Sequence, residues 1–144
     1  MPKGKTLLAA AFLIALPTAS AFAQDAGDAA AGEKVFRKCM ACHKVGEGAK
    51  NGVGPILNGV VGRKAGEAEG FRYSKLNHAA GEAGLVWTEE NIIEYLPDPN
   101  GFLKKFLTDA GKADEAKGST RMTFRLKDEQ DRRDVVAYLK TFSK

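Results

Sequence analysis

Apolar residues recur at helical spacing in several short segments, and no segment alternates apolar and polar residues as a half-buried strand does. Asp28 has the residue type of a helix N-cap. It precedes small or apolar residues at helical spacing, namely Gly32, Val35, Phe36 and Cys39. Ser74 is expected to cap a second short helix that continues through His78. The pattern predicts an all-α protein with long loops.

Three more helices are predicted in the second half of the chain. One begins after Thr88 and ends at Pro97, which cannot continue a helix. Asp98-Pro99 has the form of an N-cap followed by a first-turn proline, and it predicts another helix. The last helix begins at Asp128 and carries one apolar stripe: Val135, Tyr138, Leu139 and Phe142. Residues 110–120 are polar and are expected to form a loop.

Residues 44–70 contain eight glycines and almost no periodicity. The same stretch is too apolar for a disordered segment, because it includes Val53, Pro55, Ile56, Leu57, Val60 and Val61. We therefore predict an ordered loop here rather than a flexible linker.

The first residues have the order of a secretory signal peptide. Lys3 and Lys5 precede an unbroken apolar run of ten residues, 7–16, and Ala21-Phe22-Ala23 has the small-x-small form of a cleavage site. The alternative is an uncleaved membrane anchor, but spanning a bilayer takes roughly 20 apolar residues. We expect cleavage after Ala23, which leaves residues 24–144 as one domain.

Charge excludes one class of partner. Loss of Lys3 and Lys5 lowers the formal net charge from +4 to +2, and basic residues are interspersed with acidic ones. No run of lysine and arginine indicates binding to nucleic acid. No segment of the expected mature chain is apolar enough to insert stably into a membrane.

Both cysteines of the chain lie in the segment Cys39-Met40-Ala41-Cys42-His43. Cys-x-x-Cys-His is the attachment sequence of c-type haem. Residues i, i+3 and i+4 of a helical turn share a face, so two thiols can bond to the porphyrin edge while the histidine reaches the iron. The motif predicts one haem c, bound covalently through Cys39 and Cys42, with His43 as an iron ligand.

The two cysteines allow three alternative interpretations. A thioredoxin-like redox pair needs a βαβ context, which the helical pattern does not offer. A structural disulfide suits an exported protein but gives His43 no role. A zinc site could combine Cys39, Cys42, His43 and His78, although adjacent Cys42 and His43 are poor joint ligands. Haem attachment accounts for all three residues of the motif.

The second axial ligand has two candidates, Met122 and His78, because Met40 is held inside the attachment turn. Met122 lies in a polar loop between two predicted helices, and a methionine can also serve only in packing. We favour Met122, because imidazole with thioether is the usual ligation of a carrier. Two neutral ligands in a buried site disfavour the charged ferric state and raise the reduction potential. With both positions filled, we expect electron transfer without substrate chemistry, and therefore no enzyme.

From about Gly32 to Lys140 the chain resembles class I cytochromes c, and in particular the long bacterial cytochrome c2 type. The matching segments beyond the cysteine motif are residues 53–63, 70–74, 87–90, 95–96, 120–124 and 137–140. The resemblance implies the class I fold, with several helices and long Gly-rich loops around one haem. Two departures are Arg121, where lysine is usual, and a longer stretch between Pro99 and Gly118, whose role the sequence leaves open.

The resemblance also implies roles for residues around the haem. The Pro55 carbonyl would accept a hydrogen bond from His43. A buried propionate would be approached by Arg63, Tyr73 and Trp87. A polar network beside Met122 would consist of Asn77, Tyr95 and Thr120. Phe124 would cover the haem near its exposed edge.

The expected function is that of a soluble, monomeric, periplasmic carrier of single electrons. Its donor would be a cytochrome bc1-type complex, and its acceptor a terminal oxidase or a photosynthetic reaction centre. Lys38, Arg121 and Lys127 are candidates for docking, which would then weaken with salt. The competing hypothesis is a haem enzyme or gas sensor with an open iron site, which requires that Met122 not bind iron.

Overall fold

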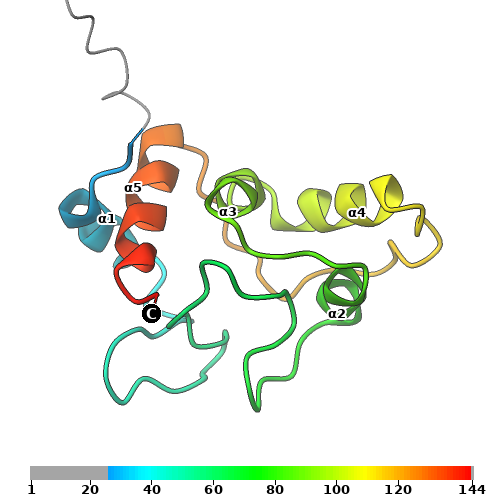
Figure 1. Cartoon of the computed structure of the whole chain (residues 1–144), viewed down its shortest axis with the longest axis horizontal. Coiled ribbons are helices and arrows are strands. Elements are labelled where there is room, and N and C mark those ends of the chain that lie inside the picture. Colours follow the sequence, from blue (N-terminus) through cyan, green and yellow to red (C-terminus); the bar gives the residue numbers. More distant parts are fainter. Residues whose placement is uncertain (1–25, 144) are drawn as a thin grey trace, which may run out of the picture.

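The computed structural model describes residues 26–143, which form five helices joined by long loops (Figure 1). The helices are α1 (Ala29–Phe36), α2 (Lys75–Glu82), α3 (Glu89–Tyr95), α4 (Pro99–Asp109) and α5 (Glu129–Lys140). In this range there is no strand, only an isolated bridge between Lys64 and Val86. The all-α prediction is therefore confirmed. The predicted signal peptide, residues 1–23, and its cleavage point lie outside the described residues.

The predicted N-caps begin the helices for the expected reason. The side chains of Asp28, Ser74, Thr88 and Asp128 each accept a hydrogen bond from the backbone N–H three residues later. Of the five N-cap residues that the structure describes, only Asp98 makes no such bond. Its carboxylate instead lies 3.2 Å from the Arg125 guanidinium. α4 thus begins with an ion pair to a distant loop in place of a local cap.

α2 continues to Glu82, four residues beyond the predicted end at His78. Gly81 lies in this additional turn and permits a close approach to the loop before the helix. A Cβ atom at this position would lie only 2.1 Å from the Ala65 carbonyl oxygen. Here glycine serves helix–loop packing rather than helix termination.

α1 and α5 pack against each other, although they lie near opposite ends of the described chain (Figure 1). Gly32 makes the close approach possible, because a Cβ atom there would lie 1.9 Å from the Asp134 carbonyl oxygen. The rings of Phe36 and Tyr138 meet at 5.5 Å, and Val135 is buried nearby. This pair of helices anchors the residues that follow α1, which include the cysteine motif.

The Gly-rich stretch 44–70 is ordered by hydrogen bonds from asparagine side chains. Asn58 bonds both backbone groups of Gly46, at 2.8 Å each. The Asn51 side chain accepts from the Ile56 N–H at 2.8 Å and donates to the Glu69 carbonyl at 2.7 Å. These bonds replace regular secondary structure and hold the loop in one shape. Among residues 26–143, no helix is long and apolar enough to cross a bilayer.

Candidate haem site

A cavity of about 260 Å³ lies between the helices and the Gly-rich loop. Helical residues provide much of its apolar wall, namely Phe36, Ile92, Tyr95, Val135 and Leu139. Loop residues complete the apolar wall, among them Leu57, Val60 and Phe71. All twelve site residues predicted from the sequence line this one cavity: Cys39, Cys42, His43, Pro55, Arg63, Tyr73, Asn77, Trp87, Tyr95, Thr120, Met122 and Phe124.

The cysteine motif lies on helical turns just after α1. The Cys39 carbonyl accepts hydrogen bonds from the Cys42 N–H at 3.1 Å and from the His43 N–H at 2.9 Å. These bonds place both thiols and the imidazole on the cavity wall. Burial raises the pKa of Cys39 to about 11, partly offset by the nearby Lys38. No disulfide joins Cys39 and Cys42 in the described chain, so both sulfurs remain eligible to bond to a haem.

A hydrogen bond to the backbone of Pro55 fixes the orientation of the His43 ring. Its Nδ1–H donates to the Pro55 carbonyl oxygen at 2.8 Å, which leaves Nε2 as the nitrogen with a free lone pair. Burial lowers the pKa of His43, and the charge of Arg63 lowers it further, so the imidazole is neutral at physiological pH. A neutral, oriented imidazole with a free lone pair is what a metal ligand requires.

Met122 has its own set of contacts. The Tyr95 hydroxyl donates to the Met122 Sδ at 3.5 Å, and the Met122 N–H donates to the Thr120 hydroxyl at 3.3 Å. Burial raises the pKa of Tyr95 to about 12, partly opposed by a hydrogen bond with the Thr120 side chain. The tyrosine therefore stays protonated and can act as the donor. The sulfur is fixed in place and retains a further lone pair for a metal.

The cavity also has a polar side, on which some buried polar atoms of the described chain lack a protein partner. Within residues 26–143, Arg63 Nε and Asn77 Oδ1 are buried without a hydrogen-bond partner. The other two nitrogens of the Arg63 guanidinium donate to the carbonyls of Asn58 and Ile56, at 3.2 and 3.1 Å. The Tyr73 hydroxyl accepts from the Ala68 N–H at 3.0 Å, and its own proton is left to donate. A buried unpaired donor is costly, so Arg63 Nε indicates an acceptor in the occupied cavity.

The position of His78 argues against the zinc site and against His78 as an iron ligand. His78 is exposed on α2 and is not among the described residues that line the cavity. A zinc site would need His78 beside the cysteines, and no cluster of three metal-binding side chains occurs among residues 26–143. Two cysteines and an oriented imidazole on the wall of one largely apolar cavity instead fit the chemistry of an attached haem.

Gly54 and Asn100 contact predicted site residues, although neither was assigned a role from the sequence. Gly54 lies directly behind the His43 ring, where a Cβ atom would come within 2.5 Å of Cε1. Asn100 accepts a hydrogen bond from the Thr120 N–H at 3.1 Å. A glycine among eight in a loop gives no distinguishing signal, and neither does a single asparagine in a helix.

Comparisons with known proteins agree with this geometry. A family profile described as cytochrome c matches residues 29–143. Cytochrome c2 iso-1 of Rhodospirillum centenum is 70% identical over 117 residues, which cover 81% of this chain and 98% of that protein. A cytochrome c2 of Rhodopseudomonas palustris is 62% identical over 136 residues, or 94% of this chain and 92% of the relative.

Solved structures show the same relationship. The structure of cytochrome c2 from Rhodospirillum centenum superposes with a TM-score of 0.81 at 70% identity, over 82% of this chain and all of the other. A ferricytochrome c2 from Rhodopseudomonas palustris gives a TM-score of 0.76 at 66% identity, over 80% of this chain and 98% of the other. The resemblance seen in the sequence, the fold class and the single haem c are thereby confirmed. The chain belongs to the cytochrome c family, as a class I, bacterial cytochrome c2-type electron carrier with one covalently attached haem c.

Proposed function

We propose that this chain is a soluble periplasmic carrier in which His43 and Met122 bind the two faces of the haem iron. The observation that carries the proposal is the convergence of four groups on one cavity: the two thiols, the Nε2 side of His43 and the Met122 sulfur. The haem supplies one-electron redox chemistry when bound. The protein contributes attachment, two oriented neutral ligands and exclusion of water.

The ligands and their surroundings explain a preference for electron transfer over substrate chemistry. Neither imidazole nor thioether carries charge, and the cavity wall is mostly apolar. Burial without a compensating anion disfavours the positively charged oxidised centre, so the reduction potential rises. With Met122 held by Tyr95 and Thr120, neither axial position is left open for a small substrate.

Arg63, Tyr73 and Trp87 are proposed to hold a haem propionate on the polar side of the cavity. Asn77 is proposed to belong with Tyr95 and Thr120 to the polar network beside Met122. The unpaired Arg63 Nε offers a donor, and the Tyr73 hydroxyl proton offers another. Burial lowers the pKa of Arg63, but arginine stays charged at any physiological pH. Its positive charge would be balanced by a buried carboxylate. This arrangement also fixes the rotation of the porphyrin within the cavity.

The opposite rim of the cavity is suited to docking. Phe124 and Val53 line the cavity and are nevertheless exposed, at 39% and 76%. Lys38 and Arg121 also line it. A rim that combines exposed apolar side chains with basic ones suits brief contact with an acidic partner surface. We propose a cytochrome bc1-type donor and, as acceptor, a terminal oxidase or a photosynthetic reaction centre.

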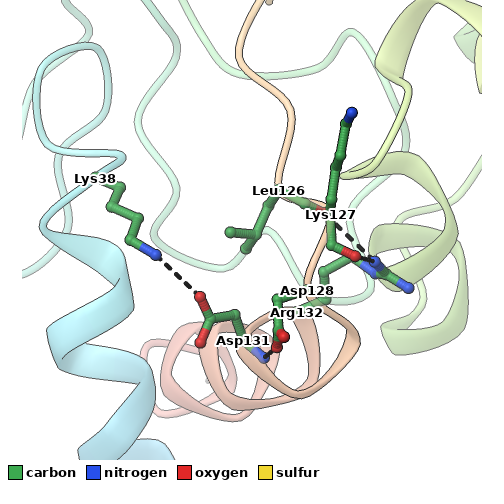
Figure 2. Close-up of polar contacts among 6 residues, drawn as sticks. All are labelled: Lys38, Leu126, Lys127, Asp128, Asp131 and Arg132. Carbon is green, nitrogen blue, oxygen red and sulfur yellow. Dashed lines mark hydrogen bonds and ion pairs between the residues drawn. The ribbon is translucent and has the colours of Figure 1, made fainter.

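The three docking candidates differ in their surroundings, and Figure 2 shows two of them, Lys38 and Lys127. Lys38 forms an ion pair with Asp131 at 2.9 Å, which partly neutralises its charge. The ammonium group of Lys127 points away from Arg132, whose guanidinium bonds the Lys127 carbonyl (Figure 2). Arg121 donates to the Arg72 carbonyl at 2.9 Å and keeps its full charge. Because Arg121 lines the cavity and Lys127 is not among the described lining residues, Arg121 is the candidate proposed to have most effect on docking.

The ligation is tested by comparing two methionine variants produced with the haem-maturation machinery. Met122→Ala should lose the near-infrared thioether-to-iron band and lower the reduction potential. Met40→Ala is the matched control, since Met40 is exposed and not among the cavity-lining residues of the described chain. It should keep both properties. An unchanged band and potential in Met122→Ala would contradict the proposal.

The location is tested separately. Periplasmic extracts should contain a coloured protein whose first residue is Gln24. Recovery of the haem protein only from membranes, with residues 1–23 still attached, would contradict cleavage and the soluble state.

A further inference from the structure

The segment that carries Met122 is fastened on both sides to the junction of α3 and α4. Before Met122, the Thr120 N–H donates to the Asn100 side-chain oxygen at 3.1 Å. After it, Arg125 pairs with Asp98 at 3.2 Å, and the Leu126 N–H donates to the Leu96 carbonyl at 2.8 Å. Residues 119–126 have no helix of their own, so these bonds replace regular structure.

The first turn of α4 is a firm support for such bonds. Pro99, Leu103 and Leu107 are almost completely buried. The Phe102 ring contacts Trp87 at 6.2 Å and Tyr95 at 5.8 Å between centroids, so the helix packs against the cavity wall itself. In contrast, residues 110–119 are largely exposed and lack regular helix. The position of the Met122 segment is therefore set by α4 more than by the chain that connects them.

A short series of contacts leads from Asn100 to the Met122 sulfur. Its oxygen holds the Thr120 backbone, the Thr120 hydroxyl accepts from the Met122 N–H, and a hydrogen bond links the Thr120 side chain to Tyr95. Tyr95 in turn donates to the Met122 sulfur. Displacing Thr120 would disturb the two groups that orient the Met122 thioether, namely the Thr120 hydroxyl and the Tyr95 hydroxyl.

We propose that Asn100 is a positioning residue that keeps the Met122 sulfur in place for the iron. This gives the longer stretch between Pro99 and Gly118 a role, namely a brace for the ligand segment. The inference rests on the proposed ligation by Met122. Residue 100 needs one side-chain oxygen that can accept a hydrogen bond from the Thr120 N–H. Aspartate keeps such an oxygen, and leucine lacks it.

The test measures how readily the ferric holoprotein exchanges Met122 for added imidazole. Imidazole can bind only in the fraction of molecules whose sulfur has left, so its apparent affinity reports that fraction. Asn100→Leu leaves the Thr120 N–H unpaired, and we expect imidazole to bind about three- to tenfold more tightly. The near-infrared band should weaken as well. Asn100→Asp should stay within about twofold of the parent, because its oxygen still accepts from the Thr120 N–H.

Asn91→Leu is the matched control, because it also removes an asparagine-to-backbone bond, from Asn91 Nδ2 to the Val86 carbonyl at 2.7 Å. We expect Asn91→Leu to lower the stability of the protein without affecting a contact of residues 119–126. The apparent affinity for imidazole should therefore stay unchanged. Asn100→Ala is the alternative variant if Asn100→Leu does not accumulate. Because alanine admits water to the Thr120 N–H, we expect a smaller rise in imidazole affinity.

The outcomes separate the brace from the ligation. Parental imidazole affinity in both Asn100→Leu and Asn100→Ala, with the band intact, overturns the brace alone. An equal rise in Asn91→Leu also overturns it, since the effect would then follow general stability. Absence of the near-infrared band in the parent overturns the ligation and the brace together.

Discussion

His43 and Pro55 are joined by a 2.8 Å hydrogen bond from the imidazole Nδ1 to the proline carbonyl oxygen. The bond crosses from the turn after α1 to the Gly-rich loop, so it connects the attachment motif to the loop that closes the cavity. Proline contributes no N–H of its own, and its ring restricts the backbone that presents the carbonyl. The orientation of the imidazole therefore depends on the shape of a loop with no regular structure.

Gly54→Ala should disturb this orientation. A Cβ atom at Gly54 would lie 2.5 Å from Cε1 of His43 and 2.8 Å from Nδ1, so the ring or the loop has to move. We expect a loss of about 1–3 kcal/mol in the free energy of unfolding, as for other overpacked sites. Denaturant titration of the holoprotein measures the loss, and a shifted reduction potential would report the altered ligand.

Gly52→Ala is the control for that variant. A Cβ atom there would meet its nearest neighbour, the Cys42 carbonyl oxygen, at an ordinary 3.6 Å. It should change stability by less than about 0.5 kcal/mol, as surface substitutions usually do. Equal losses in the two variants would show that the loop resists any side chain, and that contact with His43 is not the cause.

Tyr95→Phe should change how stability depends on alkaline pH. Burial raises the pKa of Tyr95 to about 12, whereas an unfolded tyrosine has a pKa of about 10. Between these values the folded state keeps a proton that the unfolded state releases. The free energy of unfolding therefore falls as pH rises, by at most about 1.4 kcal/mol per pH unit.

Phenylalanine has no proton to lose, so the difference in stability between parent and Tyr95→Phe should shrink above pH 10. Unfolding of both proteins in denaturant at pH 8, 10 and 11 measures it. A difference that stays constant across this range would mean that Tyr95 ionises as easily in the folded protein as in the unfolded one.

Sequence reasoning succeeded where the signal was local. The N-caps at Asp28, Thr88 and Asp128 were recognisable because capping needs only a short polar side chain before an apolar stripe. It erred at the end of α2, because the role of Gly81 depends on Ala65, which lies sixteen residues earlier. Asp98 and Pro99 begin α4 as predicted, but the capping bond from the Asp98 side chain is absent, and that carboxylate instead pairs with Arg125 on a distant loop.

The residues of the site show the same difference between local and non-local signals. The attachment motif is contiguous, so it could be recognised from the sequence, and the few eligible residues led to Met122 as the proposed second ligand. The contacts that hold them, Gly54 behind His43 and Asn100 beside Thr120, are non-local packing and hydrogen bonding. They have no pattern of their own in a single sequence.

Gly32→Ala should destabilise the protein strongly. A Cβ atom at Gly32 would lie 1.9 Å from the Asp134 carbonyl oxygen, a backbone atom that cannot rotate away. Alanine favours the helix itself by about 1 kcal/mol over glycine, yet we expect a net loss of about 3 kcal/mol because α1 must separate from α5. Glu33→Ala, at an exposed position of the same helix, is the control and should change little. A gain in thermal stability for Gly32→Ala would mean that helix propensity outweighs the contact.

The ion pair between Lys38 and Asp131 predicts opposite effects from its two members on the rate of association. Lys38→Ala removes a positive charge from the cavity rim, whereas Asp131→Asn removes the acid that neutralises it. The backbone N–H of Asp131 still bonds Asp128, so the start of α5 is kept (Figure 2). At low salt the first variant should react with purified reaction centres about two- to fivefold more slowly than the parent, and the second faster.

Lys105→Ala matches the net charge of Lys38→Ala but lies on α4, paired with Asp109 and outside the described cavity lining. It should slow the reaction less, because steering depends on where charge lies as well as on its sum. All of these differences should fade as ionic strength rises, since screening shortens the Debye length to about 3 Å at 1 M salt. Equal slowing by Lys38→Ala and Lys105→Ala would mean that net charge alone attracts the partner. In that case the rim around Phe124 and Val53 would have no special part in docking.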